Sequence, residues 1–344
     1  MSPKPRNTEN RHLPARWRFK HGAYYFRVPA NAKHLWDGKT EFRLGSTIQE
    51  AYREYANRVE MFIDAETVAQ LLDRYVVEIV PGKAAKTQQS NQTSIRRLRP
   101  VFGDMPISAV KPKHAYQYMD KVTKSSGAAS ANRDFEVLSH AMSCAVRWGL
   151  IDRNILKGQV RKNRIPRRER YVEDWEINEA LKIASPILRA YIVLKLLTGL
   201  RRGDLLRLRV DDLEEDGIHV RTSKTGKRLI ISWTEELTSA IEAALASRPK
   251  DIVPWLFCTR NGDCYVKADG SANAFDSLWQ RFVRNVVSKT SVKERFQEKD
   301  LRKKTASDMS LEAASKLLGH TSKTTTRRHY ALKGQLVEPH SIRR

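Results

Sequence analysis

Cysteine is scarce in this chain of 344 residues. It occurs only at Cys144, Cys258 and Cys264, which is an odd number, and no two of these residues form a Cys-x-x-Cys pair. A disulfide framework needs paired cysteines, and a zinc knuckle needs closely spaced ones. The sequence therefore argues against both, and we expect three reduced thiols that lie mostly in hydrophobic cores.

Long apolar runs are also missing. The most apolar stretch, residues 190–197, is short and is interrupted by Lys195, whereas a membrane-spanning helix needs about 18–20 apolar residues. The N-terminus, Met1-Ser-Pro-Lys-Pro-Arg6, has no hydrophobic region of the kind that a signal peptide requires. No P-loop and no acidic metal cluster is recognisable, so we expect no cofactor. These absences favour a cytosolic protein.

Acidic residues are too few to balance the basic ones. The chain has 39 Asp and Glu against 63 Lys and Arg, a formal net charge of +24 and a pI near 10.1. Such an excess repels itself in a compact fold, so an anionic partner is the first explanation. A membrane surface would call for a basic amphipathic helix, a lipidation signal or a long apolar run. We therefore expect a nucleic-acid partner and no membrane.

Residues 1–64 predict a basic arm followed by a small domain. Six Lys and Arg stand against one Glu in residues 1–20, a composition typical of a flexible arm or a solvated terminus. Two β-favouring runs follow, at residues 23–28 and 40–45. A helix is predicted to begin next, because Thr47 and Glu50 have the spacing of a capping box. The domain is thus expected to be a small sheet with one helix.

Residues 65–157 are predicted to form four helices around one core. Apolar residues recur with helical spacing, and the predicted helices cover residues 67–80, 88–99, 114–124 and 129–148. The second of them is expected to end at Pro100. It carries Arg96, Arg97 and Arg99, which are candidates for contacts with DNA phosphates.

Residues 158–171 have no apolar periodicity and indicate a basic linker. Arg164, Arg167 and Arg168 lie within it. A run of this kind is usually only a solvated segment. Between two DNA-contacting domains, however, it would pass near phosphates and let the protein close as a clamp.

Helical patterns resume at Trp175, and an arginine then lies at the junction of two helices. Thr198-Gly199 ends one helix, and Arg201 precedes the next. Arginine suits phosphate binding, because its planar guanidinium donates two hydrogen bonds and stays charged. Asp204 is placed to brace that guanidinium. An ordinary surface arginine at a helix start is the alternative.

Residues 218–232 predict a β-hairpin with a glycine-containing turn. Lys224 lies at its tip, where it could reach into a minor groove and give a proton to a departing 5′-oxygen. Most lysines in turns only add solubility, so this role depends on the rest of the site. Lys227 is predicted to contact the DNA backbone or to be solvated.

The C-terminal part gathers a Lys, an Arg, a His and a Tyr within a short span. Lys299 and Arg302 are three residues apart and therefore share a helix face, while Lys303 and Lys304 are expected to face DNA or solvent. His320 follows a Leu-Leu-Gly sequence, and Tyr330 ends a Thr-rich segment. The set suits attack of a tyrosine on a phosphodiester, with cationic groups holding the charged oxygens.

Together, residues 198–204, 223–226, 299–302 and 317–330 resemble the catalytic boxes of the tyrosine recombinases, the phage integrase family. The resemblance implies a mainly α fold with small β-sheets (α+β). It also implies an arm-binding domain at 1–64, a core-binding domain at 65–157, a catalytic domain at 172–334 and a tail at 335–344. The catalytic residues that it implies are Arg201, Lys224, Lys299, Arg302, His320 and the nucleophile Tyr330.

The resemblance further implies a phage- or prophage-type integrase in the cytoplasm and nucleoid of a bacterial host. It would act as a homotetramer on paired double-stranded DNA sites, with accessory DNA-bending proteins as further partners. Cleavage would give a 3′-phosphotyrosyl link and a free 5′-hydroxyl. Because that link keeps the energy of the phosphodiester, neither ATP nor a metal would be needed.

The chain departs from the family pattern at two positions. Lys299 stands where His is usual, and lysine is a poor base at neutral pH unless its pKa is lowered. His329 occupies the usual place of the tyrosine, nine residues after His320, and Tyr330 comes tenth. These departures leave open a catalytically degenerate DNA-binding protein. A type IB topoisomerase is a second alternative, against which the predicted arm-binding domain argues.

Overall fold

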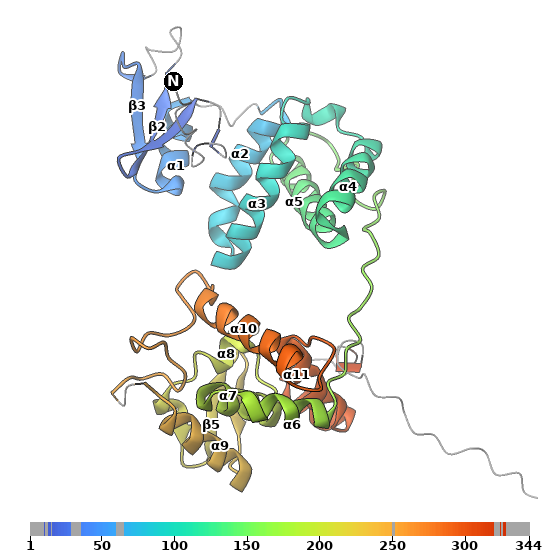
Figure 1. Ribbon diagram of the computed structural model, residues 1–344. Helices are drawn as coiled ribbons and strands as arrows, with labels where there is room; N and C mark the ends of the chain where they lie inside the picture. Colours follow the sequence, from blue (N-terminus) through green and yellow to red (C-terminus); the bar gives the residue numbers. More distant parts are fainter. Residues whose placement is uncertain are drawn as a thin grey trace, which may run out of the picture. The chain divides into compact units, whose positions relative to one another are not determined.

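The computed structural model describes residues 10, 13–14, 16–28, 36–59, 65–249, 252–319, 324 and 326–327. Within these residues the fold is mainly α-helical with two small three-stranded sheets (Figure 1), as predicted. The chain divides into two compact units, residues 1–166 and 167–344, and we describe each by itself. No helix in the described part combines the length and the apolar character that crossing a membrane requires.

The first unit begins with an antiparallel sheet and one helix. They comprise β1 (Trp17–Lys20), β2 (Ala23–Arg27), β3 (Glu41–Gly45) and α1 (Ile48–Val59). The predicted capping box of α1 is confirmed, because Thr47 Oγ1 accepts from the N–H of Glu50 and a Glu50 carboxylate oxygen accepts from that of Thr47. The prediction of a flexible arm up to residue 20 is wrong for β1. Trp17 is buried there and packs against Tyr52, with ring centroids 4.8 Å apart.

Four further helices complete the first unit, as predicted. They are α2 (Val68–Glu78), α3 (Ala85–Phe102), α4 (Pro112–Ser126) and α5 (Ala128–Arg147), with the 3-10 turns η3 (Val80–Gly82) and η4 (Ile107–Ala109). The predicted end of the second helix at Pro100 is wrong, because α3 continues to Phe102. Burial of the Phe102 ring in the helical core offsets the backbone hydrogen bond that Pro100 cannot donate.

The second unit consists of helices and one three-stranded antiparallel sheet, which includes the hairpin. The helices are α6 (Asp174–Ile183), α7 (Pro186–Thr198), α8 (Arg202–Leu205), α9 (Glu235–Ala246), α10 (Asn273–Lys289), α11 (Glu298–Ser307) and α12 (Leu311–Leu317). A 3-10 turn, η5 (Val210–Asp212), precedes the strands β4 (Leu213–Glu214), β5 (Gly217–Arg221) and β6 (Arg228–Ile231). The predicted hairpin is confirmed, with Ile218 opposite Ile231 and Arg221 opposite Arg228.

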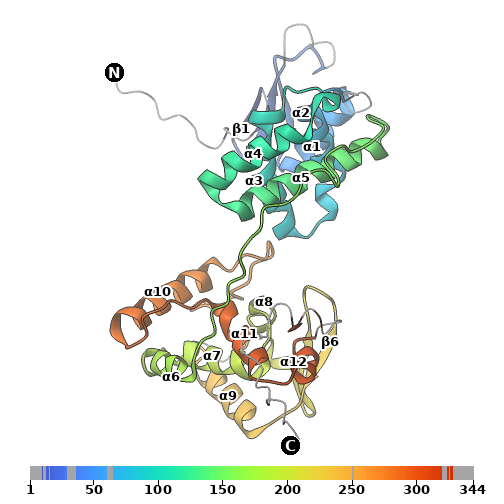
Figure 2. The same ribbon diagram turned by 90° about the vertical axis from the view of Figure 1, so that its right-hand side faces the viewer.

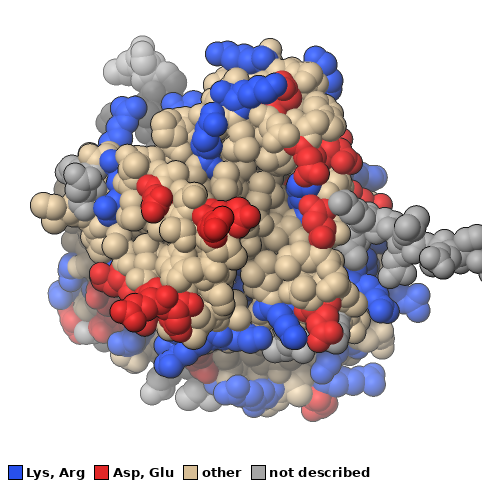
Figure 3. Space-filling model, turned by 90° about the horizontal axis from the view of Figure 1, so that it is seen from below, with Lys and Arg blue, Asp and Glu red and all other residues tan. Residues whose placement is uncertain are grey.

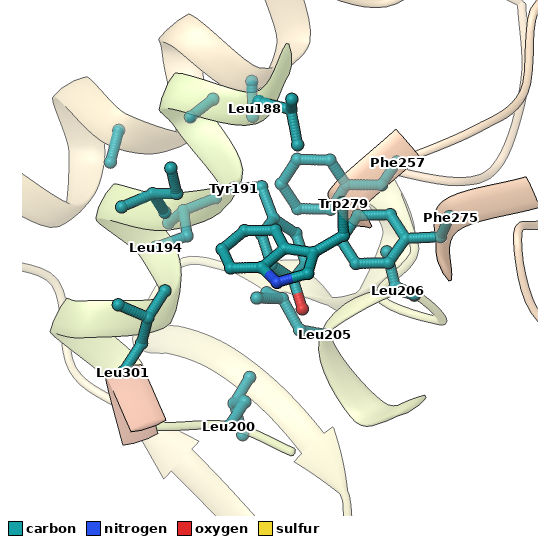
Figure 4. Close-up of a cluster of buried hydrophobic side chains, with 14 of the residues drawn as sticks. Leu188, Tyr191, Leu194, Leu200, Leu205, Leu206, Phe257, Phe275, Trp279 and Leu301 are labelled. Carbon is teal, nitrogen blue, oxygen red and sulfur yellow. The ribbon is translucent and has the colours of Figure 1, made fainter. Parts of the chain in front are cut away.

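An aromatic cluster lies at the centre of the second unit. Figure 4 shows Tyr191 of α7 among Phe257, Phe275 and Trp279. The Tyr191 ring lies 4.6 Å from Phe275, 5.4 Å from Phe257 and 6.2 Å from Trp279, measured between centroids. Aromatic contacts at these separations add to the free energy gained by burial. They fix α7, whose C-terminal end leads directly to Arg201.

The cysteines are free thiols, as predicted. Cys144 and Cys258 are buried in cores, and Cys264 is partly buried.

Candidate active site

Arg201 lies in the turn between α7 and α8, as predicted. Gly199 in this turn has a left-handed conformation, with φ of 57°. A Cβ atom at Gly199 would lie 2.9 Å from Cδ2 of Leu318, so glycine lets the turn approach the end of α12. Nη1 of Arg201 is buried and has no hydrogen-bond partner in the described part of the chain. Such a donor is suited to binding an anion.

Arg302 joins the Arg201 turn to the segment that leads to His320. Its side chain is buried; Nη1 donates to the carbonyl oxygen of Gly199 and Nη2 to that of Leu318, at 3.1 Å. These carbonyls belong to residues two positions before Arg201 and His320. Figure 2 shows α11, which carries Arg302, beside α7 and α12. Arg302 therefore holds the two turns at a fixed spacing.

Asp204 holds the turn that carries Lys224. Its Oδ1 atom accepts hydrogen bonds from the N–H of Ser223 at 2.9 Å and from the Ser223 hydroxyl at 2.6 Å. We predicted that Asp204 braces Arg201, but the contacts that the structure gives it are with Ser223, because the β5–β6 turn folds back onto α8. Lys224 and Lys227 are exposed in that turn.

The hairpin also approaches the end of α12. Gly319 has φ of 65°, and a Cβ atom there would lie 3.2 Å from Cδ1 of Leu229 on β6. Glycine thus permits close packing of the residue before His320 against the hairpin. Three turns therefore meet: one with Arg201, one with Lys224 and one that leads to His320.

Lys299 lies exposed in the first turn of α11, on a charged cavity of about 710 Å³. Four cationic and two acidic side chains contribute to its lining: Arg168, Arg202, Arg295, Lys299, Asp276 and Glu298. Arg202 pairs with Asp276. The net charge of these lining side chains is positive, which suits an anionic partner.

His320 and Tyr330 lie outside the described residues, as does His329. The structure describes the chain up to Gly319 and, beyond it, Thr324, Thr326 and Arg327. Their predicted roles, including nucleophilic attack by Tyr330, stay predictions.

Arg168 and Lys303, both predicted to contact DNA, bind within the second unit. Nε of Arg168 lies 2.8 Å from Oδ2 of the fully buried Asp300, and Nη2 donates to the carbonyl of Arg295. Nζ of Lys303 donates to the carbonyl oxygen of Arg168 at 2.5 Å. These contacts attach the start of the unit to α11. The side chains of Arg167 and of Arg164 in the first unit are exposed.

The three arginines predicted on the second helix differ in their surroundings. Arg97 forms an ion pair with the buried Asp134, with Nε 3.1 Å from Oδ2, and Arg99 pairs with Asp73. Arg96 is exposed. Arg97 and Arg99 therefore stabilise the helical core, and Arg96 is the one of the three whose side chain is available at the surface.

Lys304 is buried, although we expected it to face DNA or solvent. Its Nζ lies 2.6 Å from Oδ1 of Asp174, 2.8 Å from the hydroxyl of Tyr171 and 3.0 Å from Oδ2 of Asp308. Burial lowers the pKa of Lys304, but these hydrogen bonds outweigh that effect and raise it above the usual value. The sequence did contain a signal for the ion pair with Asp308, because Lys304 and Asp308 are four residues apart and therefore share a helix face.

Lys195 and Glu298 form a buried ion pair that the sequence analysis missed. Lys195 lies on α7 and Glu298 at the start of α11. We interpreted Lys195 only as an interruption of an apolar stretch. A single cation on the buried face of an apolar helix predicts a buried acidic partner. The sequence therefore contained a signal for this ion pair.

Comparison with known proteins relates this chain to the phage integrases. Residues 171–335 match the phage integrase family. The integrase of Escherichia phage HK022 is 29% identical over 252 residues, which are 67% of this chain and 68% of that protein.

Solved structures of lambda integrase share the fold. One is a lambda integrase dimer bound to a COC' core site, with a TM-score of 0.66 at 20% identity, covering 99% of this chain and 100% of that one. The other is a lambda integrase tetramer bound to a Holliday junction, with a TM-score of 0.62 at 21% identity, covering 91% and 97%. Residues 171–335 thus form a domain of the phage integrase family, and the chain is a site-specific tyrosine recombinase.

Proposed function

We propose that this recombinase cuts and rejoins double-stranded DNA at attachment sites, and so integrates and excises a phage or another mobile element. The observation that carries the proposal is the convergence of three turns, tied by Arg302 to Gly199 and Leu318 and by Asp204 to Ser223. Similarity to lambda integrase bound to a core site and to a Holliday junction supports DNA as the substrate.

In the proposed reaction the hydroxyl oxygen of Tyr330 attacks the scissile phosphorus. A bond forms between that oxygen and phosphorus, and the bond from phosphorus to the 5′-oxygen breaks. Arg201, Arg302 and His320 stabilise the negative charge of the transition state. The buried Nη1 of Arg201, which has no protein partner among the described residues, is available to the phosphate. A 5′-hydroxyl from the partner strand then reverses the reaction.

Two protons move in this step. Lys224, exposed on the hairpin turn, gives one to the departing 5′-oxygen. The tyrosine proton leaves to water, because lysine, which stands at position 299 in place of the usual histidine, is ordinarily a poor base. We propose that Lys299 donates to a non-bridging phosphate oxygen from its exposed position on α11.

The first unit is proposed to contact DNA through its helices. A cavity of about 760 Å³ there is lined in part by Lys83, Lys86 and Arg133. Cationic side chains that neutralise phosphates supply much of the affinity of a protein for DNA. We propose an arm-binding domain at residues 1–64 and a core-binding domain at residues 65–157.

Exposed cations outside this cavity are further candidates for phosphate contacts: Arg96, Arg164, Arg167 and Lys227. The face seen in Figure 3 carries acidic side chains in several groups, one of them near its centre, and basic side chains mostly toward its edge. This mixed face is therefore not the surface that we assign to DNA.

The proposed assembly is a homotetramer on two paired sites, with accessory DNA-bending proteins, in the cytoplasm and nucleoid of a bacterial host. The lambda integrase tetramer on a Holliday junction supports four protomers. For the 335–344 tail two alternatives stay open: docking on a neighbouring protomer, or a solvated end of the chain without a fixed partner.

A nicked suicide DNA substrate tests the function. Once the short strand beyond the nick diffuses away, religation is blocked and the protein–DNA adduct accumulates. We expect an adduct with the wild-type protein, formed without metal or ATP, and none with Tyr330→Phe. Tight and specific binding by the wild type without any adduct would instead support a non-catalytic DNA-binding protein.

A further inference from the structure

A charged side chain lies on the buried face of α7. Lys195 is 1% exposed, and its neighbours in the core of the second unit are mostly apolar. Its Nζ forms an ion pair with Oε1 of Glu298 and donates to the carbonyl oxygen of Leu200 at 2.5 Å. Both partners are therefore needed to compensate a charge that has been removed from water.

Tyr191, one helical turn earlier, binds the same carboxylate. Its hydroxyl donates to Oε1 of Glu298 at 2.8 Å. Its ring is fully buried in the aromatic cluster of Figure 4, so the position of the hydroxyl is fixed by packing. The carboxylate of Glu298 is thus held by two donors from one rigid helix.

These contacts reach the two segments that carry the proposed phosphate ligands. Leu200 immediately precedes Arg201, and Glu298 immediately precedes Lys299. One ammonium group therefore binds the backbone before Arg201 and the side chain before Lys299. Burial lowers the pKa of Lys195, while Glu298 opposes this effect. Apolar side chains would fill the same space without desolvating any charge, so packing alone does not account for this ion pair.

We propose that Lys195 is a positioning residue for strand cleavage, which acts with Glu298 to hold the Arg201 turn and the start of α11 at the spacing that one phosphate requires. This inference rests on the proposed function. The side chain of Lys195 would act through the two segments and not through contact with DNA. Loss of the pair would then impair cleavage more than folding or DNA binding.

The decisive variant is Lys195→Met/Glu298→Leu. It removes both charges together, so neither is left buried without a partner, and it keeps side chains of similar size. We expect a Kd for the attachment site close to that of the wild type. The melting temperature should fall moderately, because the Leu200 carbonyl and the Tyr191 hydroxyl lose their partners. At saturating DNA, the first-order rate of adduct formation on the nicked substrate should fall at least about tenfold, because small misplacements of binding groups are costly.

Lys304→Met is the matched control. It also removes a buried lysine from ion pairs, with Asp174 and Asp308, but Lys304 has no described contact with Leu200 or Glu298. We expect a lower melting temperature and a cleavage rate within about threefold of the wild type, since the spacing of the Arg201 turn is kept.

The outcomes separate the two proposals. No adduct from the wild type would overturn the proposed function. An active wild type with a double variant slowed less than about threefold, or no more than Lys304→Met, would overturn the role of Lys195 alone. If the double variant does not fold, Tyr191→Phe decides, because it keeps the ring and removes one donor to Glu298. A rate unchanged in Tyr191→Phe would contradict the inference, and slowing of about threefold or more at unchanged Kd would support it.

Discussion

Oδ1 of Asp204 accepts two hydrogen bonds from Ser223, one from its N–H at 2.9 Å and one from its hydroxyl at 2.6 Å. Asp204 belongs to α8, which begins next to Arg201, and Ser223 precedes Lys224 at the hairpin turn. The carboxylate therefore couples the proposed phosphate-binding arginine to the proposed proton donor. It does so through the backbone, without touching either side chain in the contacts that the structure gives.

Replacing Asp204 should loosen the Lys224 turn. Asp204→Leu removes both acceptor contacts, and we expect the rate of strand cleavage at saturating DNA to fall about tenfold to a hundredfold. Ser223→Ala keeps the backbone hydrogen bond and should be milder. Asp216→Leu is the control. Asp216 is exposed, precedes β5 at the end away from the Lys224 turn, and forms a hydrogen bond with His219. An equal loss of rate in the control would refute the coupling.

Arg302→Lys should be damaging although it conserves the charge. A lysine presents a single ammonium group in place of a planar fork, so it cannot reproduce both contacts with Gly199 and Leu318. A buried carbonyl without its donor costs about 1–3 kcal/mol. We expect the free energy of unfolding to fall by about that amount, measured by urea denaturation, and the cleavage rate to fall roughly a hundredfold. A fully active Arg302→Lys protein would contradict this account of the site.

Two glycines with left-handed backbones should respond differently to alanine. At either position, a side chain at positive φ costs about 1–2 kcal/mol of conformational energy. A Cβ at Gly199 also meets Leu318, whereas nothing lies within 4 Å of one at Gly226. Gly199→Ala should therefore destabilise the protein by about 1–3 kcal/mol more than Gly226→Ala. Equal melting temperatures for the two variants would argue against close packing of the Arg201 turn on α12.

The stability of the first unit should depend on the pH through His140. Burial, and then the charge of Lys83, lower the pKa of His140 below its ordinary value of 6.5, and its Nδ1 lies 2.8 Å from the hydroxyl of Tyr75. The folded state thus favours the neutral ring. The free energy of unfolding that depends on the neutral ring is therefore fully present above pH 6.5, and it is lost as the pH falls below that value.

Thermal unfolding at pH 7.5 and at pH 5.5 checks this prediction. The melting temperature of the wild type should drop between the two, and that of His140→Gln should drop less. The same drop in both proteins would assign the pH dependence to other groups.

The sequence was informative where a residue type and its spacing have one main structural explanation. The turn at Thr198-Gly199 and the hairpin around Lys224 followed from helix-ending and turn-forming residues, and the structure confirms both. The capping box at Thr47 and Glu50 is equally local. Local signals of this kind can be interpreted from the sequence, because they involve only neighbouring residues and do not depend on which distant segments pack together.

Contacts between distant segments could not be predicted in the same way. Arg168 looks like any other arginine of a basic linker, yet it pairs with Asp300, 132 residues later. Whether a cation faces DNA or a buried carboxylate depends on which helix packs beside it, and the sequence does not state that. The same limit applies to Asp204, whose partner Ser223 belongs to another element.

The central claim is that Tyr330 forms the covalent link with DNA, and peptide mapping of the trapped adduct tests it most directly. The adduct would be digested with nuclease and protease, and the peptide that retains a nucleotide would be sequenced by mass spectrometry. We predict that the nucleotide is attached to Tyr330, ten residues after His320. Attachment to any other residue, or a peptide with no nucleotide at all, would contradict the account.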